Sequence, residues 1–76
     1  MKTQRENNMK NFWMIQIQVV IDHELVGLGY VNGFEDGMPT FTSNKFESLR
    51  FETVPLAKEW GKTNIHGYDW LVALQN

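Results

Sequence analysis

The chain has 76 residues, a formal net charge of −2 and no cysteine. This length allows one domain with a small core and a stability of roughly a few kcal/mol. The lack of cysteine excludes a disulfide framework and a thiolate zinc site, and it favours a cytoplasmic location. Residues 12–76 carry four lysines and arginines against eight acidic residues. This acidic body lacks the basic footprint that broad binding to nucleic-acid backbones requires.

Residues 1–11 show no apolar periodicity, and we expect a disordered leader followed by a single domain over 12–76. The leader is too polar for a signal peptide, and the longest apolar run of the chain is too short to span a bilayer. We therefore expect no association with a membrane.

The run over 12–21 has the strongest strand signal in the chain. One face is apolar throughout and comprises Trp13, Ile15, Ile17, Val19 and Ile21. The other face is mixed, with two glutamines among apolar residues. A strand that is dry on one face and half-dry on the other is expected to be central in a small sheet.

A second strand is expected over 26–31, joined to the first by a four-residue loop over 22–25. A two-residue loop would place Glu24 opposite Ile21 on the core face, and we reject it for that reason. The four-residue loop pairs Ile17 with Tyr30 and places Val31 on the second face of the sheet.

The segment 32–39 is rich in turn-forming residues and is predicted to be a loop. Residues 40–42 form a short strand near an edge, because Pro39 cannot donate to a ladder. Residues 49–52 alternate, with Leu49 and Phe51 predicted to face inward.

Thr53 has the features of a helix N-cap, and Pro55 is tolerated in the first turn that follows it. Gly61 is predicted to be the C-cap, which gives a helix of about two turns. The stripe that should pack on the sheet comprises Leu56, Ala57 and Trp60, and the outward positions are Lys58, Glu59 and Lys62.

The C-terminal strand is expected over 68–74, with Trp70 facing inward and the first strand as its partner. The predicted fold is α+β: a four- to five-stranded antiparallel sheet with one short helix packed on one face. The C-terminal strand lies beside the N-terminal strand.

Phe41-Thr42, the run Ser48-Leu49-Arg50-Phe51-Glu52-Thr53 and Ala57 make the chain resemble small uncharacterised proteins of phages and prophages of Gram-positive bacteria. The resemblance covers roughly residues 12–62. It implies an accessory or host-directed binding protein in a bacterial cytoplasm, and it supplies no catalytic residues.

No catalytic, metal-binding or cofactor-binding set emerges from the sequence. Asp22-His23-Glu24 is predicted to be a solvated hairpin tip, because adjacent turn residues point in different directions and no second histidine lies at ligand spacing. His66 stands alone in a predicted loop. Neither Ser43 nor Ser48 is flanked by the glycines of a nucleophile elbow. We expect a protein that is not an enzyme and uses no cofactor.

One short helix can cover only one face of such a sheet, so the second face needs another cover. Its apolar residues form the predicted interface: Phe12, Met14, Val20, Val31, Leu71 and Ala73. We expect a non-catalytic protein-interaction module that binds another protein, or a second copy of itself as a homodimer. The alternatives are a cover formed by the leader or by the 32–39 loop, and a nucleic-acid-associated regulatory module.

Overall fold

In the computed structural model of the chain, the described part comprises residues 11–75, without the side chains at positions 19–20 and 25–28. Most of the predicted leader therefore lies outside the described residues. The elements are the strands β1 (Trp13–Ile21), β2 (Glu24–Glu35), β3 (Met38–Thr42) and β4 (Asp69–Leu74), the 3-10 turn η1 (Lys45–Glu47) and the helix α2 (Val54–Asn64).

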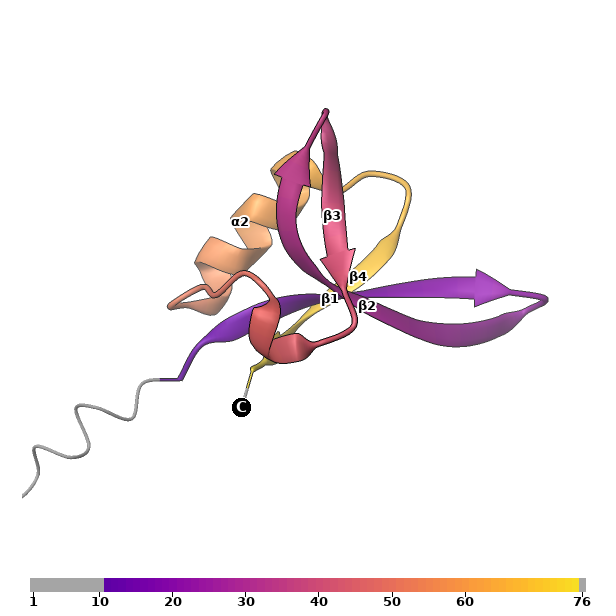
Figure 1. Ribbon diagram of the computed structural model, residues 1–76, viewed down its shortest axis with the longest axis horizontal. Coiled ribbons are helices and arrows are strands. Elements are labelled where there is room, and N and C mark those ends of the chain that lie inside the picture. Colours follow the sequence, from indigo (N-terminus) through magenta and orange to yellow (C-terminus); the bar gives the residue numbers. More distant parts are fainter. Residues whose placement is uncertain (1–10, 76) are drawn as a thin grey trace, which may run out of the picture.

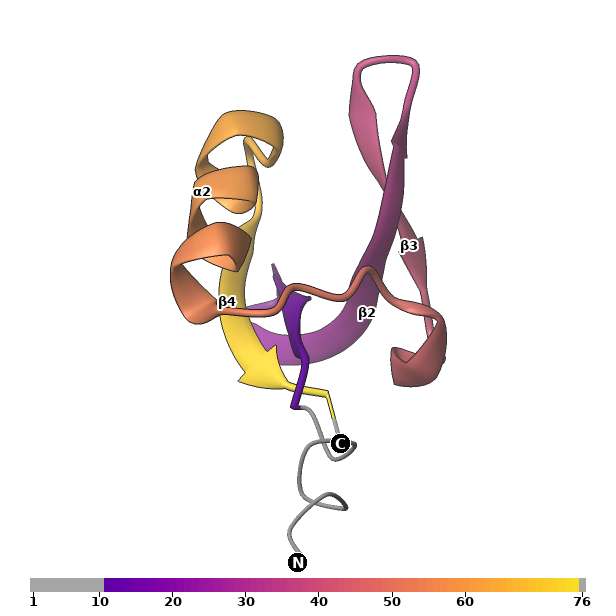
Figure 2. The ribbon, with the colours of Figure 1, turned by 90° about the vertical axis from the view of Figure 1, so that its left-hand side faces the viewer.

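The strands form one antiparallel sheet in the order β3-β2-β1-β4, with α2 packed on one face (Figure 1). This confirms the predicted α+β class and the position of the C-terminal strand beside the first. β2 bends strongly, so the β2–β3 hairpin rises opposite α2 and β4 (Figure 2). Two edge-on aromatic contacts join the two sides, between Phe34 and Trp60 and between Phe41 and Tyr68.

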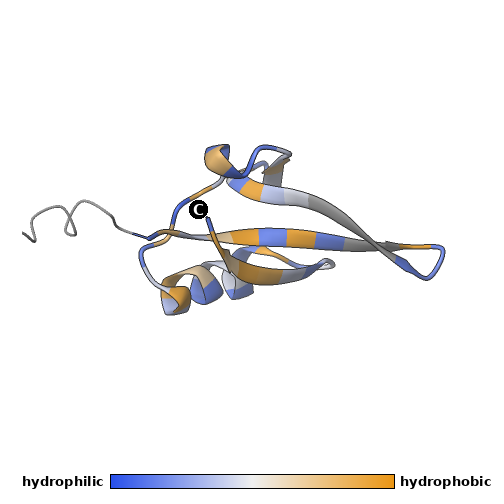
Figure 3. Cartoon of the chain, turned by 90° about the horizontal axis from the view of Figure 1, so that it is seen from below, coloured by the Kyte–Doolittle hydropathy of each residue, from blue (hydrophilic) through white to orange (hydrophobic). Residues whose placement is uncertain are grey.

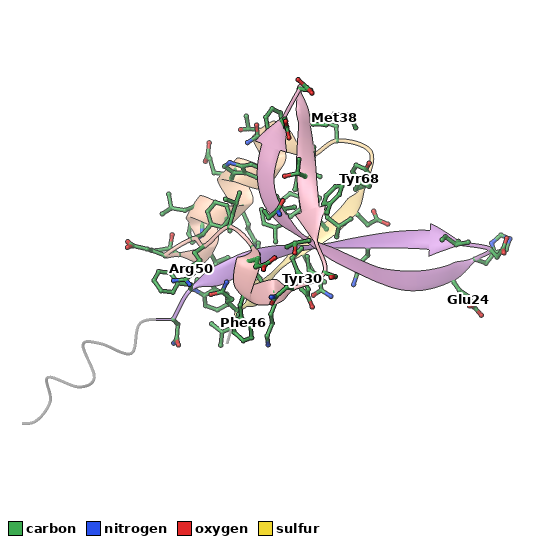
Figure 4. All side chains as sticks on the ribbon, viewed as in Figure 1. Glu24, Tyr30, Met38, Phe46, Arg50 and Tyr68 are labelled. Carbon is green, nitrogen blue, oxygen red and sulfur yellow. The ribbon has the colours of Figure 1, made fainter. Side chains whose placement is uncertain are left out.

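The β1–β2 turn has two residues, and the predicted four-residue loop is wrong. Asp22 and His23 both have positive φ, 52° and 68°, as the twist-matched two-residue hairpin turn requires. Ile21 does pair with Glu24, the arrangement rejected from the sequence. It is tolerated because Ile21 is 53% exposed, so this end of the hairpin lies beyond the core (Figure 4).

A β-bulge then changes the pairing, because the register shifts between Ile17 and Gln18. Gln18 pairs with Gly27 and Ile17 with Gly29, so β2 has one extra residue between the two glycines. The extra residue reverses which positions of β2 face α2. Val31 consequently lies in the core, fully buried, and its predicted place on the second face is wrong.

The predicted 32–39 loop is also wrong, because β2 continues to Glu35 and β3 begins at Met38. Asp36 and Gly37 form the connecting turn, with φ values of 55° and 79°. The Asp-Gly pair is a strong hairpin signal, since both central residues of this turn need positive φ. β3 is an edge strand, which confirms the prediction made from Pro39.

The core lies between the sheet and α2. Its buried residues are Ile15, Ile17, Val31, Ala57 and Ile65, with Leu49, Phe51, Trp60, Tyr68, Trp70 and Val72 packed around them. Figure 3 shows that apolar and polar residues alternate along β1, so that the apolar residues lie on the face toward α2 and the polar ones on the second face. The segment leading to α2 crosses the strands here, and Phe51 exchanges two backbone hydrogen bonds with Trp13 (2.8 and 2.9 Å). Leu49 and Phe51 face inward, as predicted, although the segment forms only an isolated bridge.

The start of α2 is confirmed and its predicted end is wrong. Thr53 Oγ1 accepts a hydrogen bond from the Leu56 N–H (3.2 Å), which caps the helix. The helix continues through Gly61 to Asn64, and Gly61 is buried within it. Leu56, predicted to pack on the sheet, is 55% exposed.

We expect Thr53→Ala to lower the free energy of unfolding by about 1 kcal/mol, because it leaves a backbone donor of the first turn without its cap. Urea denaturation followed by tryptophan fluorescence measures this change. Thr63→Ala, at an exposed position in the last turn of the same helix, is the matched control and should leave stability nearly unchanged. Equal losses in both variants would contradict the assigned cap.

Candidate functional site

The predicted interface residues divide into three groups in the structure. Met14, Leu71 and Ala73 do lie together on the face away from α2, because Met14 pairs with Ala73 and Gln16 with Leu71. Phe12 adjoins this face, half-buried, with the Arg50 guanidinium 5.2 Å from its ring centre. Val31 belongs to the core instead, and the side chain of Val20 lies outside the described residues.

The chain's own η1 turn covers one end of the second face. The buried side chain of Gln75 donates to the Lys45 carbonyl oxygen (3.0 Å) and to Ser48 Oγ (3.2 Å). Ser48 Oγ in turn donates to the same carbonyl (2.6 Å). Met14, near this end of the face, is only 4% exposed. A segment that the sequence did not implicate therefore supplies part of the cover.

What remains accessible on this side of the molecule is centred on β4. Leu71 is 38% exposed on the second face, whereas Leu74, which pairs with Trp13, is 39% exposed on the opposite face near the end of the strand. β4 lies at the edge of the sheet, so within the described chain it pairs with another strand on one side only.

The backbone of β4 also presents unpaired groups at this edge. The Gln75 N–H donates to the Phe12 carbonyl (2.9 Å), so the hydrogen-bonded pairs of the ladder are those at every second position from there. The N–H and C=O groups of Trp70, Val72 and Leu74 consequently point away from β1. Such an edge can accept a further strand.

A groove of about 610 Å³ runs between α2 and β4, lined by Val54, Lys58, Lys62, Trp70, Leu71 and Val72. Figures 1 and 2 show α2 and β4 running side by side. Within the described part of the chain, neither lysine takes part in an ion pair. The edge of β4 is thus bordered by two exposed positive charges.

A second groove of about 530 Å³ lies on the other side of α2. Phe51, Leu56 and Trp60 supply its apolar lining, and Glu52 and Glu59 are its acidic residues. Among the described residues, none that lines this groove belongs to a strand of the sheet.

The polar side chains considered for catalysis do not converge. His23 is exposed at the β1–β2 turn, and His66 Nε2 hydrogen bonds to the Thr63 carbonyl (3.2 Å). Ser48 uses its hydroxyl in the buried contacts with Lys45 and Gln75 described above. Over residues 11–75, no group of three or more histidine and carboxylate side chains is placed to hold a metal ion.

Comparison with protein-family models, with curated proteins and with solved structures gives no match for this chain. Among the helices in the described residues, none has the length and hydropathy needed to cross a bilayer.

Sequence reasoning found the face that carries Leu71 but missed the lysines and the strand edge beside it. Lys58 and Lys62 were correctly predicted to be exposed, yet they carry no motif. The predicted pairing of the C-terminal strand with β1 was the available signal, since β1 already has β2 on its other side.

Proposed function

We propose that this protein is a non-catalytic protein-interaction module, and that its partner binds at β4 over Leu71. The observation that carries the proposal is the combination, on one edge strand, of exposed leucines and outward-pointing backbone groups. Apolar side chains beside unpaired backbone groups suit a protein partner, which can bury the first and hydrogen bond to the second. The phage or prophage setting, in the cytoplasm of a bacterial host, belongs to the same proposal and is supported by the sequence resemblance alone.

A nucleic-acid-associated role is less well supported by the geometry. Trp60, Tyr68 and Trp70 are partly buried against the core, which reduces the ring surface that could stack on bases. The two lysines of the β4 groove are few for a phosphate-binding surface, and the body of the chain is acidic.

The test compares Leu71→Lys with Leu56→Lys, a control at a more exposed leucine on α2 (55% against 38%). Each variant is immobilised and exposed to a lysate of a Gram-positive bacterium, and the retained proteins are quantified against the unmodified chain. We expect Leu71→Lys to lose the partner by at least tenfold and Leu56→Lys to retain it, because a lysine ammonium resists desolvation in an apolar contact.

Retention of the same proteins by both variants would remove β4 from the interaction. A salt-dependent shift of a DNA or RNA probe that Leu71→Lys leaves unchanged would favour the nucleic-acid alternative instead.

A further inference from the structure

Resting on the proposed function, we propose that the partner segment is an extended acidic strand. It pairs with the outer edge of β4 and places alternate carboxylates beside Lys58 and Lys62. The structure supplies the three components of such a site: outward backbone groups on β4, a groove along them, and two cations on its helical side. Main-chain hydrogen bonds would give the pairing, and side chains at alternate positions would give the selectivity.

The spacing of the two lysines suits alternate residues of a strand. Lys58 and Lys62 are four residues apart on α2, so they lie about 6 Å apart along the helix axis. Residues i and i+2 of a strand are about 6.7 Å apart and point to the same face. Since α2 runs alongside β4, two carboxylates in an acidic-x-acidic pattern can each meet one lysine.

The opposite face of the added strand meets a different surface. Leu71 is exposed on the side of β4 away from α2, so the intervening residues of the partner would lie next to an apolar side chain. The partner segment is therefore one in which acidic residues alternate with apolar ones.

The charges argue against a second copy of this chain as the occupant. Two β4 strands paired edge to edge in antiparallel fashion are related by a twofold axis perpendicular to the sheet, which leaves both helices on the same face. Lys58 and Lys62 of each copy would then meet the same lysines of the other across the axis. The nearest acidic residue of α2, Glu59, lines the other groove and cannot offset this repulsion.

The probe is an acetylated and amidated nine-residue peptide in which glutamate alternates with valine. Two matched peptides carry glutamine or lysine in place of glutamate. Binding is followed by the amide NMR signals of Trp70, Val72 and Leu74 during titration. We expect the glutamate peptide to bind with a dissociation constant about tenfold lower than the glutamine peptide, since two exposed ion pairs supply a factor of that order.

The double variant Lys58→Glu/Lys62→Glu should reverse the preference, with the lysine peptide now binding about tenfold more tightly than the glutamate peptide. The single variants Lys58→Glu and Lys45→Glu change the net charge by the same amount and form the matched pair, in which Lys58→Glu should lose most of the preference for the glutamate peptide. Lys45 lies on η1, where its ammonium is 5.2 Å from the Phe46 ring centre, so the Lys45→Glu variant should retain the original preference. Thermal unfolding of each variant confirms that these exposed substitutions leave the fold intact.

In an added antiparallel strand, the residues that face α2 are also the ones that hydrogen bond to Trp70, Val72 and Leu74. Replacing one glutamate of the peptide by N-methylglutamate therefore removes a main-chain donor, keeps the carboxylate and tests the strand pairing itself. The N-methylated peptide should bind about tenfold more weakly, or weaker still. Unchanged binding would overturn the assigned strand addition.

Three other results would overturn the inference: equal binding of the three peptides, shifts confined to residues away from β4, or a dimer mass by light scattering that Leu71→Lys converts to a monomer. The lysate experiment distinguishes this failure from failure of the proposed function. A partner lost from Leu71→Lys, combined with peptides that do not bind, would leave β4 as the docking surface and exclude the acidic strand.

Discussion

Replacing Trp70 with alanine is expected to lower the free energy of unfolding by about 3–5 kcal/mol, nearer the lower value because the indole is half-buried. Trp70 lies on β4 opposite Ile17, packs against the core cluster, and places its six-membered ring directly on Gly61 of α2. It therefore joins the edge strand to the helix. A domain of this size has roughly a few kcal/mol of stability, so we expect a substantial unfolded population at 25 °C.

Urea denaturation followed by circular dichroism measures the loss, because the substitution removes one of the fluorescent reporters. Leu71→Ala is the matched control on the same strand, where the side chain faces away from α2 and is 38% exposed. It should cost about 1 kcal/mol or less. A Trp70→Ala variant as stable as this control would mean that the two faces of β4 are assigned the wrong way round.

Gly61→Ala is expected to destabilise the protein by about 1–3 kcal/mol, although alanine is the better helix former by about 1 kcal/mol. A Cβ at this position would meet Trp70 Cη2 and lie 2.6 Å from Cζ2 and Cζ3. The indole is rigid and packed between the helix and the sheet, so it cannot move aside without losing contacts with the core. The absence of a side chain at Gly61 is what allows α2 to approach β4 so closely.

The double variant gives the sharper test, because removal of the indole removes the clash. In a Trp70→Ala background, Gly61→Ala should become stabilising by up to about 1 kcal/mol, the intrinsic difference in helix propensity. The double-mutant cycle should thus show a coupling free energy of about 2–4 kcal/mol between the two positions. If Gly61→Ala has the same effect in both backgrounds, the close approach of helix and indole is not what destabilises the single variant.

Much of the fold could be predicted from local pattern. The alternation over 12–21 identified the central strand, Thr53 identified the start of the helix, and the apolar C-terminal run identified β4. The errors fell on the hairpins and on the end of the helix. Asp36-Gly37 was a readable turn signal, but Asp22-His23 is a less common pair for positive φ. Gly27 and Gly29, which flank the extra residue of β2, are typical of a bulge or of a bend, and this signal does not fix the register.

The candidate site was predicted less completely for a related reason. The predicted exposure of Leu71 on the second face is confirmed. Val31 was predicted on the same face but lies in the core, because β2 contains one extra residue. A one-residue change in register reverses every side chain beyond it, so an error at the turn or bulge reaches distant positions. The cover by η1 depends on Gln75, thirty residues from Lys45 in the chain, and local pattern does not report such a contact.

By itself, the sequence determined the central strand, the start of the helix and the place of the last strand beside the first, because these follow from the period of apolar residues and from short-range capping chemistry. Only the tertiary structure decided which glycine is a packing surface, which side chains of β2 are buried, and that two lysines border a free strand edge. Those features arise from contacts between α2, β2 and β4, whose residues are distant in the chain, and their geometry is set by how the side chains pack together.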